Sequence, residues 1–164
     1  MSSPMEQLYQ QIILDHAKTP HGRGLAEGFD AESFQVNPTC GDEVRLRLHL
    51  VHGDGAGTTP AIEKVTWDGQ GCSISQASIS VMAELVTGVP VPTAEQISET
   101  FRELMHARGQ GLDEDAEDRL GDAAAFTGVA RYPARIKCAL LGWMALRDTL
   151  VQSGAASTTQ EEPT

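Results

Sequence analysis

The chain has 164 residues, of which 40% are hydrophobic and 21% charged, and its formal net charge is −11. Such an acidic chain offers no basic stripe that could neutralise phosphates, which argues against a nucleic-acid-binding function. No apolar run approaches the roughly 18 residues of a membrane span, and the N-terminus lacks a secretory pattern, so we expect a cytoplasmic protein that contacts no membrane.

The first half of the chain predicts one helix and a small sheet. Residues 4–18 carry apolar residues near helical spacing, and Pro20 follows the end of this helix. Apolar and charged residues alternate over residues 44–50, as in a strand with one buried face. A returning strand over residues 61–69, closed by a turn at Asp68-Gly69, and a third strand around 34–36 would complete an antiparallel sheet.

The second half of the chain predicts helices. A helical period resumes after Gly71 and stops near Gly88 and Pro90, and Thr93 is a candidate N-cap for the next helix. The acidic segment 112–122 is predicted to be a solvated loop or short helix without chemistry. A last helix runs from Pro133 to about Val151. The chain is therefore predicted to be a single α+β domain over residues 1–151, with helices on one face of about three strands and a disordered tail over residues 152–164.

The three cysteines form no CxxC pair, and a structural disulfide is not expected in a reducing cytosol. They could be inert core thiols, a catalytic thiol with two bystanders, or a metal site built from distant segments. Cys40 falls on a turn, Cys72 at the start of a helix and Cys138 in the first turns of the last helix, where the helix dipole favours a thiolate. Arg135 adds a positive charge near Cys138. This placement favours reactive or ligating cysteines.

Asp42 follows Cys40 by two residues, and Gly41 between them permits a sharp turn. Three thiolates and one carboxylate make four ligands, which suits tetrahedral zinc. Alternatively Asp42 caps its own turn, and the spacing alone does not decide between the two. A carboxylate matches zinc less well than a thiolate does, so such a centre should be more labile than a Cys₄ site.

The five histidines are scattered, and none forms a ligand-spaced pair such as HxxxH. Solvation is the favoured interpretation for His49, on the polar face of a strand, and for His52, in a glycine-rich loop.

The motifs "NPTCGD", "GQGCSISQAS" and "PARIKC", in this order, resemble the U-type (IscU/NifU-like) iron–sulfur cluster assembly family. The resemblance covers nearly the whole chain and is closest to the SufU branch. The family's cysteines correspond to Cys40, Cys72 and Cys138, and its aspartate to Asp42. The cluster-scaffold branch usually carries a histidine directly before the last cysteine, and Lys137 stands there in this chain. This departure favours the zinc-binding branch.

The resemblance implies a zinc-dependent sulfur carrier with an IscU/NifU-N-like fold. Its partner would be a pyridoxal-phosphate-dependent cysteine desulfurase of the SufS type, and downstream iron–sulfur assembly proteins would receive the sulfur. Cys40 would accept persulfide sulfur, and zinc would be held by Cys40, Asp42, Cys72 and Cys138. Arg135 would stabilise thiolate charge or contact the partner. Docking would replace the Cys40 thiolate on zinc with a histidine of the desulfurase.

Two alternatives stay open. The chain could be a scaffold on which [2Fe–2S] clusters form, since thiolates are suitable cluster ligands. It could also be a structural zinc domain that acts as an interaction module, although a structural site is normally closed by Cys or His and Asp42 counts against this.

Overall fold

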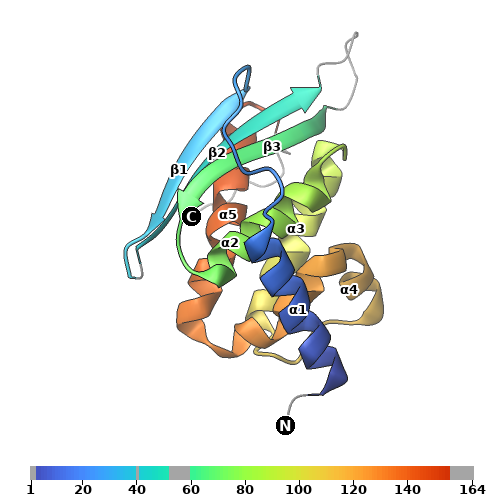
Figure 1. Ribbon diagram of the computed structural model, residues 1–164. Coiled ribbons are helices and arrows are strands. Elements are labelled where there is room, and N and C mark those ends of the chain that lie inside the picture. Colours follow the sequence, from blue (N-terminus) through green and yellow to red (C-terminus); the bar gives the residue numbers. More distant parts are fainter. Residues whose placement is uncertain (1–2, 40, 52–59, 156–164) are drawn as a thin grey trace.

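The computed structural model describes residues 3–39, 41–51 and 60–155, and it has the predicted α+β architecture (Figure 1). One helix precedes a three-stranded sheet, and the remaining helices follow it. In chain order the elements are α1 (Pro4–Lys18), β1 (Ala31–Asn37), β2 (Asp42–Val51), β3 (Ala61–Gln70), α2 (Ser73–Val86), α3 (Val91–His106), α4 (Glu114–Leu120), the 3₁₀ segment η1 (Gly121–Arg131) and α5 (Pro133–Gln152).

The predicted first helix is confirmed, and local sequence explains where it begins. Ser3 is the N-cap and exchanges hydrogen bonds with Glu6 in a capping box, while Pro4 occupies the first turn, where its missing N–H is not needed. The helix packs against α2 and η1. Its buried residue is His16, which is only 6% exposed, so this contact has a polar centre.

The sheet is antiparallel with the strand order β1-β2-β3. The turn predicted at Asp68-Gly69 is wrong, because β3 continues through both residues to Gln70. Gly69 lies opposite Val44, and a Cβ at this position would collide with the carbonyl oxygen of Glu43. The glycine therefore permits close approach of two strands, a role that sequence cannot distinguish from a turn.

Helices cover one face of the sheet, as predicted. In Figure 1, α5 crosses behind β1 and β2 while α2 lies below β3, and contacts between these elements agree with the view. The fully buried Val44, Leu46 and Leu48 of β2 face the helices. Phe101 of α3 stacks on Trp143 of α5 with ring centroids 4.6 Å apart. This core fixes where the ends of β2, α2 and α5 meet.

The other face of the sheet carries charged side chains beside the exposed Phe34 and Val36, and it is not simply solvated. Arg47 donates to Glu32 at 2.7 Å, and this hydrogen bond holds the pKa of Glu32 below its usual value. The solvation expected for His49 is wrong: it is 2% exposed, and its Nε2 lies 3.0 Å from Thr66 Oγ1. Residues 19–30 run past this region, and Asp30 N–H donates to the carbonyl of Leu48. His52 lies outside the described residues.

The start of one helix in the second half differs from the prediction. α3 begins at Val91 with Pro90 as N-cap, so the prediction of Thr93 as N-cap is wrong. Pro92 explains the shift, because a proline is well suited to a first helical turn. The acidic segment forms the short helix α4, whose N-cap Asp113 accepts a hydrogen bond from Ala116 N–H at 2.9 Å.

The last helix extends to Gln152, one residue beyond the predicted end. Residues 156–164, most of the predicted disordered tail, lie outside the described residues, so the tail stays a prediction. None of the helices in the described part of the chain is long and apolar enough to cross a membrane.

Candidate metal centre

Asp42, Cys72 and Cys138 come together at one end of the sheet. One ligand atom of each lies within 4.8 Å of the others. The topology explains why: β2 begins with Asp42 beside the end of β3, because Glu43 pairs with Gln70. Two residues after β3, Cys72 starts α2, and α5 brings Cys138 across from its packing on β1 and β2.

The Asp42 carboxylate reaches across to the start of α2. It is 2% exposed, its Oδ1 accepts a hydrogen bond from Cys72 N–H at 3.0 Å, and its Oδ2 lies 3.8 Å from Cys72 Sγ. The turn before Asp42 is closed by another side chain, since Asn37 Oδ1 accepts from Thr39 N–H at 3.2 Å. Of the two interpretations left open for Asp42, this geometry favours the one in which its carboxylate belongs to the centre.

Gly71 leaves the space that the carboxylate occupies. A Cβ at this position would collide with Asp42 Oδ1 and would lie 2.6 Å from Ser75 Oγ. Ser75 is buried, and its hydroxyl donates to the carbonyl of Cys72 at 3.1 Å. The glycine of "GQGC" therefore allows Asp42 and the first turn of α2 to meet.

Both described cysteines lie near the N-termini of helices, as predicted. Cys72 is the half-buried N-cap of α2, and its side chain makes no capping hydrogen bond to the helix. Cys138 is 3% exposed in α5, with Sγ 3.6 Å from the carbonyl oxygen of Ala134. The N-terminal turns of two helices are thus close to the sulfur atoms, and the positive end of a helix dipole favours anionic ligand atoms.

The donor set fits zinc. Zinc bonds to sulfur at about 2.3 Å and to carboxylate oxygen at about 2.0–2.2 Å, so tetrahedral ligands lie roughly 3.5–3.8 Å from one another. The 3.8 Å between Cys72 Sγ and Asp42 Oδ2 agrees with this spacing. Burying a carboxylate beside two cysteines costs free energy unless these groups are protonated or share a bound cation. Three ligands also leave one tetrahedral position for a fourth.

Two of the predicted site residues are not placed in the centre by these observations. Cys40 lies outside the described residues, although Gly41 beside it has a φ of 77°, in the left-handed region that favours glycine. Arg135 is exposed in the first turn of α5, three residues before Cys138. Their roles as sulfur acceptor and as charge-stabilising residue stay predictions.

Sequence reasoning missed three residues that support the centre. Gly71 and Ser75 fix the approach of Asp42 to α2, and Asn37 closes the preceding turn. The amide nitrogen of Asn37 is buried and has no hydrogen-bond partner among the described residues. All three fall inside or beside the motifs, but their roles depend on contacts between strands and α2 that sequence spacing does not reveal.

Comparisons with known proteins place the chain among relatives of one kind. The family model described as the NifU-like N-terminal domain matches residues 8–139. The zinc-dependent sulfurtransferase SufU of Bacillus subtilis is 40% identical over 142 residues, an alignment that covers 87% of this chain and 88% of that protein. The iron–sulfur cluster assembly scaffold protein IscU of Streptococcus pyogenes is 35% identical over 154 residues, with 94% and 89% covered.

A solved structure shows the same fold. The N-terminal part of a nitrogen-fixing NifU-like protein from Brucella abortus superposes with a TM-score of 0.74, over 94% of this chain and 100% of that chain. At 24% identity this likeness concerns the fold alone. The fold predicted from the three motifs is confirmed.

Proposed function

The chain belongs to the family of NifU-like N-terminal domains, and we propose that within it the protein is a zinc-dependent sulfur acceptor for iron–sulfur cluster assembly. The sulfur donor is a persulfide on a pyridoxal-phosphate-dependent cysteine desulfurase. The resemblance inferred from the three cysteine motifs, including its closeness to SufU, is confirmed by the relatives. The proposal goes further, to the metal, the acceptor residue and the partner.

The observation that carries the proposal is the convergence of Asp42, Cys72 and Cys138 within 4.8 Å. These residues and Cys40 would hold the zinc ion. When bound, zinc supplies a positive charge that keeps thiolates deprotonated at neutral pH. Asp42 has a second task, because its Oδ1 accepts from the N–H of Cys72, the N-cap of α2, and so holds Cys72 in place.

Cys40 is the residue that takes the sulfur. In the sequence Cys40 falls between the end of β1 and the start of β2. The Cys40 thiolate attacks the outer sulfur of the desulfurase persulfide, a new S–S bond forms, and the old S–S bond breaks with the desulfurase thiolate as leaving group. The electrons balance without any external oxidant, since one persulfide replaces another.

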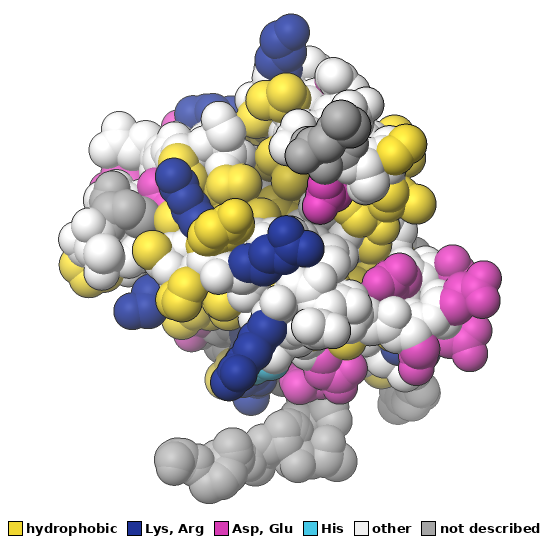
Figure 2. Space-filling view, turned by 90° about the horizontal axis from the view of Figure 1, so that it is seen from below, with side chains coloured by type: hydrophobic (Ala, Val, Ile, Leu, Met, Phe, Trp, Pro, Cys, Tyr) yellow, Lys and Arg dark blue, Asp and Glu magenta, His cyan; other side chains and the backbone are white. Residues whose placement is uncertain are grey.

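The surface beside the centre suits an acidic and partly apolar partner patch. At the start of α5, Tyr132 is 59% exposed, and Arg131, Arg135 and Lys137 are exposed as well. Next to it lies an open hollow of about 610 Å³ that Pro133 and Ile136 help to line. Figure 2 shows Lys and Arg side chains among hydrophobic ones on the lower face, with acidic side chains gathered on the side where Figure 1 places α4.

The test is the rate of alanine formation from cysteine by the desulfurase, with zinc-loaded or metal-stripped protein added. We expect saturable stimulation by the zinc form alone, and none by Cys40→Ala. Ser73→Ala, at an exposed position next to Cys72, is the control and should stimulate like the unchanged protein. Full stimulation by Cys40→Ala would refute the role of Cys40, and equal stimulation by the stripped protein would refute the role of zinc.

A second function, assembly of [2Fe–2S] clusters on this chain, is favoured by the scaffold name of the Streptococcus pyogenes relative. Two thiols and a carboxylate can also bind iron, and a carboxylate ligand would ease release of the cluster. Anaerobic incubation with iron, cysteine and desulfurase distinguishes the two. A scaffold develops intense visible absorption that persists through gel filtration, whereas the zinc protein stays colourless.

A further inference from the structure

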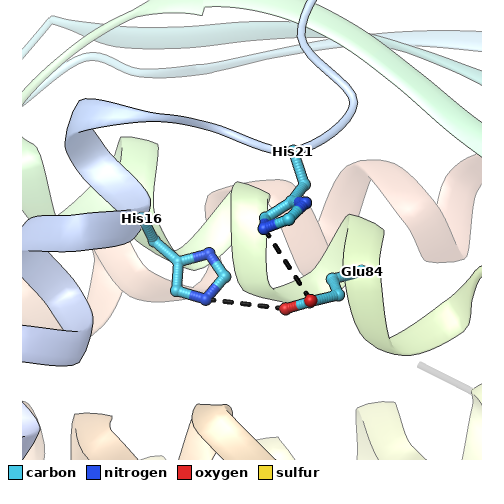
Figure 3. A group of neighbouring side chains, drawn as sticks. All are labelled: His16, His21 and Glu84. Carbon is cyan, nitrogen blue, oxygen red and sulfur yellow. Dashed lines mark ion pairs between the residues drawn. The ribbon is translucent and has the colours of Figure 1, made fainter.

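We propose that His16, His21 and Glu84 form a second metal site, which binds a divalent first-row transition cation such as zinc. These residues come from the end of α1, the segment that follows it and the last turn of α2 (Figure 3). One ligand atom of each lies within 4.8 Å of the others. No part of this site belongs to the cysteine centre: Glu84 is twelve residues after Cys72, which corresponds to about 18 Å along α2.

The distances suit a shared cation. His16 Nε2 lies 3.6 Å from Glu84 Oε1, and His21 Nε2 lies 3.7 Å from Glu84 Oε2. Nitrogen and oxygen ligands at about 2.0–2.2 Å from zinc are separated by roughly 3.3–3.6 Å in a tetrahedral site. In Figure 3 both imidazole rings turn an edge nitrogen toward the same carboxylate. A small adjustment of the exposed His21 and Glu84 side chains closes the site.

Three hydrogen bonds hold the two histidines in place before any cation arrives. His16 is 6% exposed, and its Nδ1 lies 2.7 Å from Ser80 Oγ, an arrangement that fixes the ring. The backbone of His21 is fixed as well, because its N–H donates to Ser80 Oγ at 2.8 Å and its carbonyl accepts from Trp67 Nε1 at 2.8 Å. A hydrogen-bonded second nitrogen and a rigid backbone are common supports of histidine ligands.

The hydrogen-bonding groups around His16 can serve both the metal-free and the metal-bound state. Without a cation, Ser80 donates its hydroxyl proton to His16 Nδ1, and His16 Nε2–H donates to Asp122 Oδ2 at 3.1 Å. With a cation, Nδ1–H donates to Ser80 Oγ instead, and the lone pair of Nε2 becomes free for the metal. Ser80 can serve in both states because a hydroxyl both donates and accepts. Binding therefore changes the tautomer of the neutral ring and releases no proton from it.

The negative charges at the C-terminal end of α2 favour the binding of a cation. Glu84 lies in the last turn, where the negative end of the helix dipole disfavours a carboxylate, and this turn carries no basic residue of its own. Asp122 adds a second carboxylate next to His16. A hollow of about 260 Å³, lined by Asp15, His16, Lys18, Thr19 and His21, opens the group to solvent and gives a cation an entry path.

Two imidazoles and a carboxylate are a ligand set for zinc, iron, cobalt or nickel rather than for calcium or magnesium, which prefer oxygen. A bound ion would join the segment after α1 to α2 and so clamp the N-terminal helix to the core.

The test is the number of zinc ions bound per chain, measured on the purified full-length protein after equilibration with zinc and removal of loosely bound metal. We expect one more ion in the unchanged protein than in His21→Ala. This variant keeps the backbone contacts of His21 and removes a half-exposed ring, so the fold should persist. His106→Ala, at another exposed histidine, is the matched control and should lose no ion.

Cobalt distinguishes the second site from the cysteine centre. Cobalt bound by thiolates gives strong near-ultraviolet charge-transfer absorption, whereas cobalt bound by nitrogen and oxygen gives only weak visible bands. In Cys72→Ala we expect one ion with only the weak bands, and we expect His21→Ala to lose that signal. Equal metal content in the unchanged protein, His21→Ala and His106→Ala would overturn the proposal and leave these residues as a polar network between helices.

Discussion

The two ends of α2 hold polar clusters of opposite character. At its N-terminal end, Cys72 meets Asp42 and Cys138, and the N–H of Cys72 donates to the Asp42 carboxylate. At its C-terminal end, Glu84 meets the imidazoles of His16 and His21. The dipole of a helix favours negative groups at its start and positive groups at its end. One helix thus carries a cysteine–carboxylate cluster at its start and a histidine–carboxylate cluster near its end.

The two clusters also differ in accessibility. Asp42 and Cys138 are 2% and 3% exposed, whereas the side chains of His21 and Glu84 are 51% and 49% exposed. A buried cluster of anionic donors depends on its cation, because removing the cation leaves charges without compensation. A half-exposed cluster can exist without one, because water and neighbouring side chains replace it.

The largest effect is expected at the N-terminal end. Asp42→Ala removes a ligand and the acceptor for Cys72 N–H, so we expect zinc affinity and stimulation of the desulfurase to fall by at least about 100-fold. Zinc content and alanine formation measure the two effects. Asp115→Ala removes an exposed carboxylate on α4 and should change neither. Unchanged zinc content and sulfur transfer in Asp42→Ala would show that Asp42 is not a zinc ligand.

A smaller effect at the same end is expected from Gly71→Ala. The new Cβ would push against Asp42 and Ser75, and displaced ligands typically cost about 10–100-fold in metal affinity. Competition with a chromophoric chelator measures this loss. The matched control is Gly128→Ala, since a Cβ at Gly128 meets nothing within 4 Å. If both variants bind zinc equally well, Gly71 does not position the carboxylate.

At the other end, His16→Ala should destabilise the fold even when a chelator keeps the protein free of metal. The substitution leaves the buried Ser80 and the partly exposed Asp122 without the ring that joins them, which costs about 1–3 kcal/mol in the free energy of unfolding. Urea unfolding measures the change, and Gln10→Ala on the exposed side of α1 is the control. A loss seen only with metal present would mean that the ring acts through the cation alone.

The smallest effect concerns a histidine remote from both clusters. Burial, reinforced by the positive charge of Lys64, lowers the pKa of His49 from its usual 6.5. The unfolded chain therefore binds a proton that the folded chain resists, so this residue makes stability fall as the pH drops below about 6.5 and through the folded pKa. His49→Gln should lose less stability than the unchanged protein between about pH 7.5 and about pH 5.5. An equal loss in both, measured by thermal unfolding, would contradict the assignment.

The fold was largely predictable because its signals are local. The periodicity of residues 4–18, the alternation along β2 and Pro133 at the start of α5 each reflect one element and its neighbours in sequence. The turn predicted at Asp68-Gly69 was wrong because sequence alone does not distinguish a glycine that permits close approach of two strands from a glycine that permits a turn. The solvation predicted for His49 was wrong for a related reason. The segment 19–30, which passes near His49, is distant from it in sequence.

The sequence by itself determined the donor chemistry: which residues offer sulfur and carboxylate, that Cys72 and Cys138 lie near the starts of helices, and which family the motifs resemble. Only the tertiary structure decided which donors meet. Asp42 faces Cys72 because β2 and β3 pair in one register, and Cys138 joins them because α5 packs across the sheet. His16, His21 and Glu84 carry no motif, since they meet only where α1 packs on α2. Side-chain chemistry is a local property of the chain, whereas proximity between distant segments depends on the packing of the whole core.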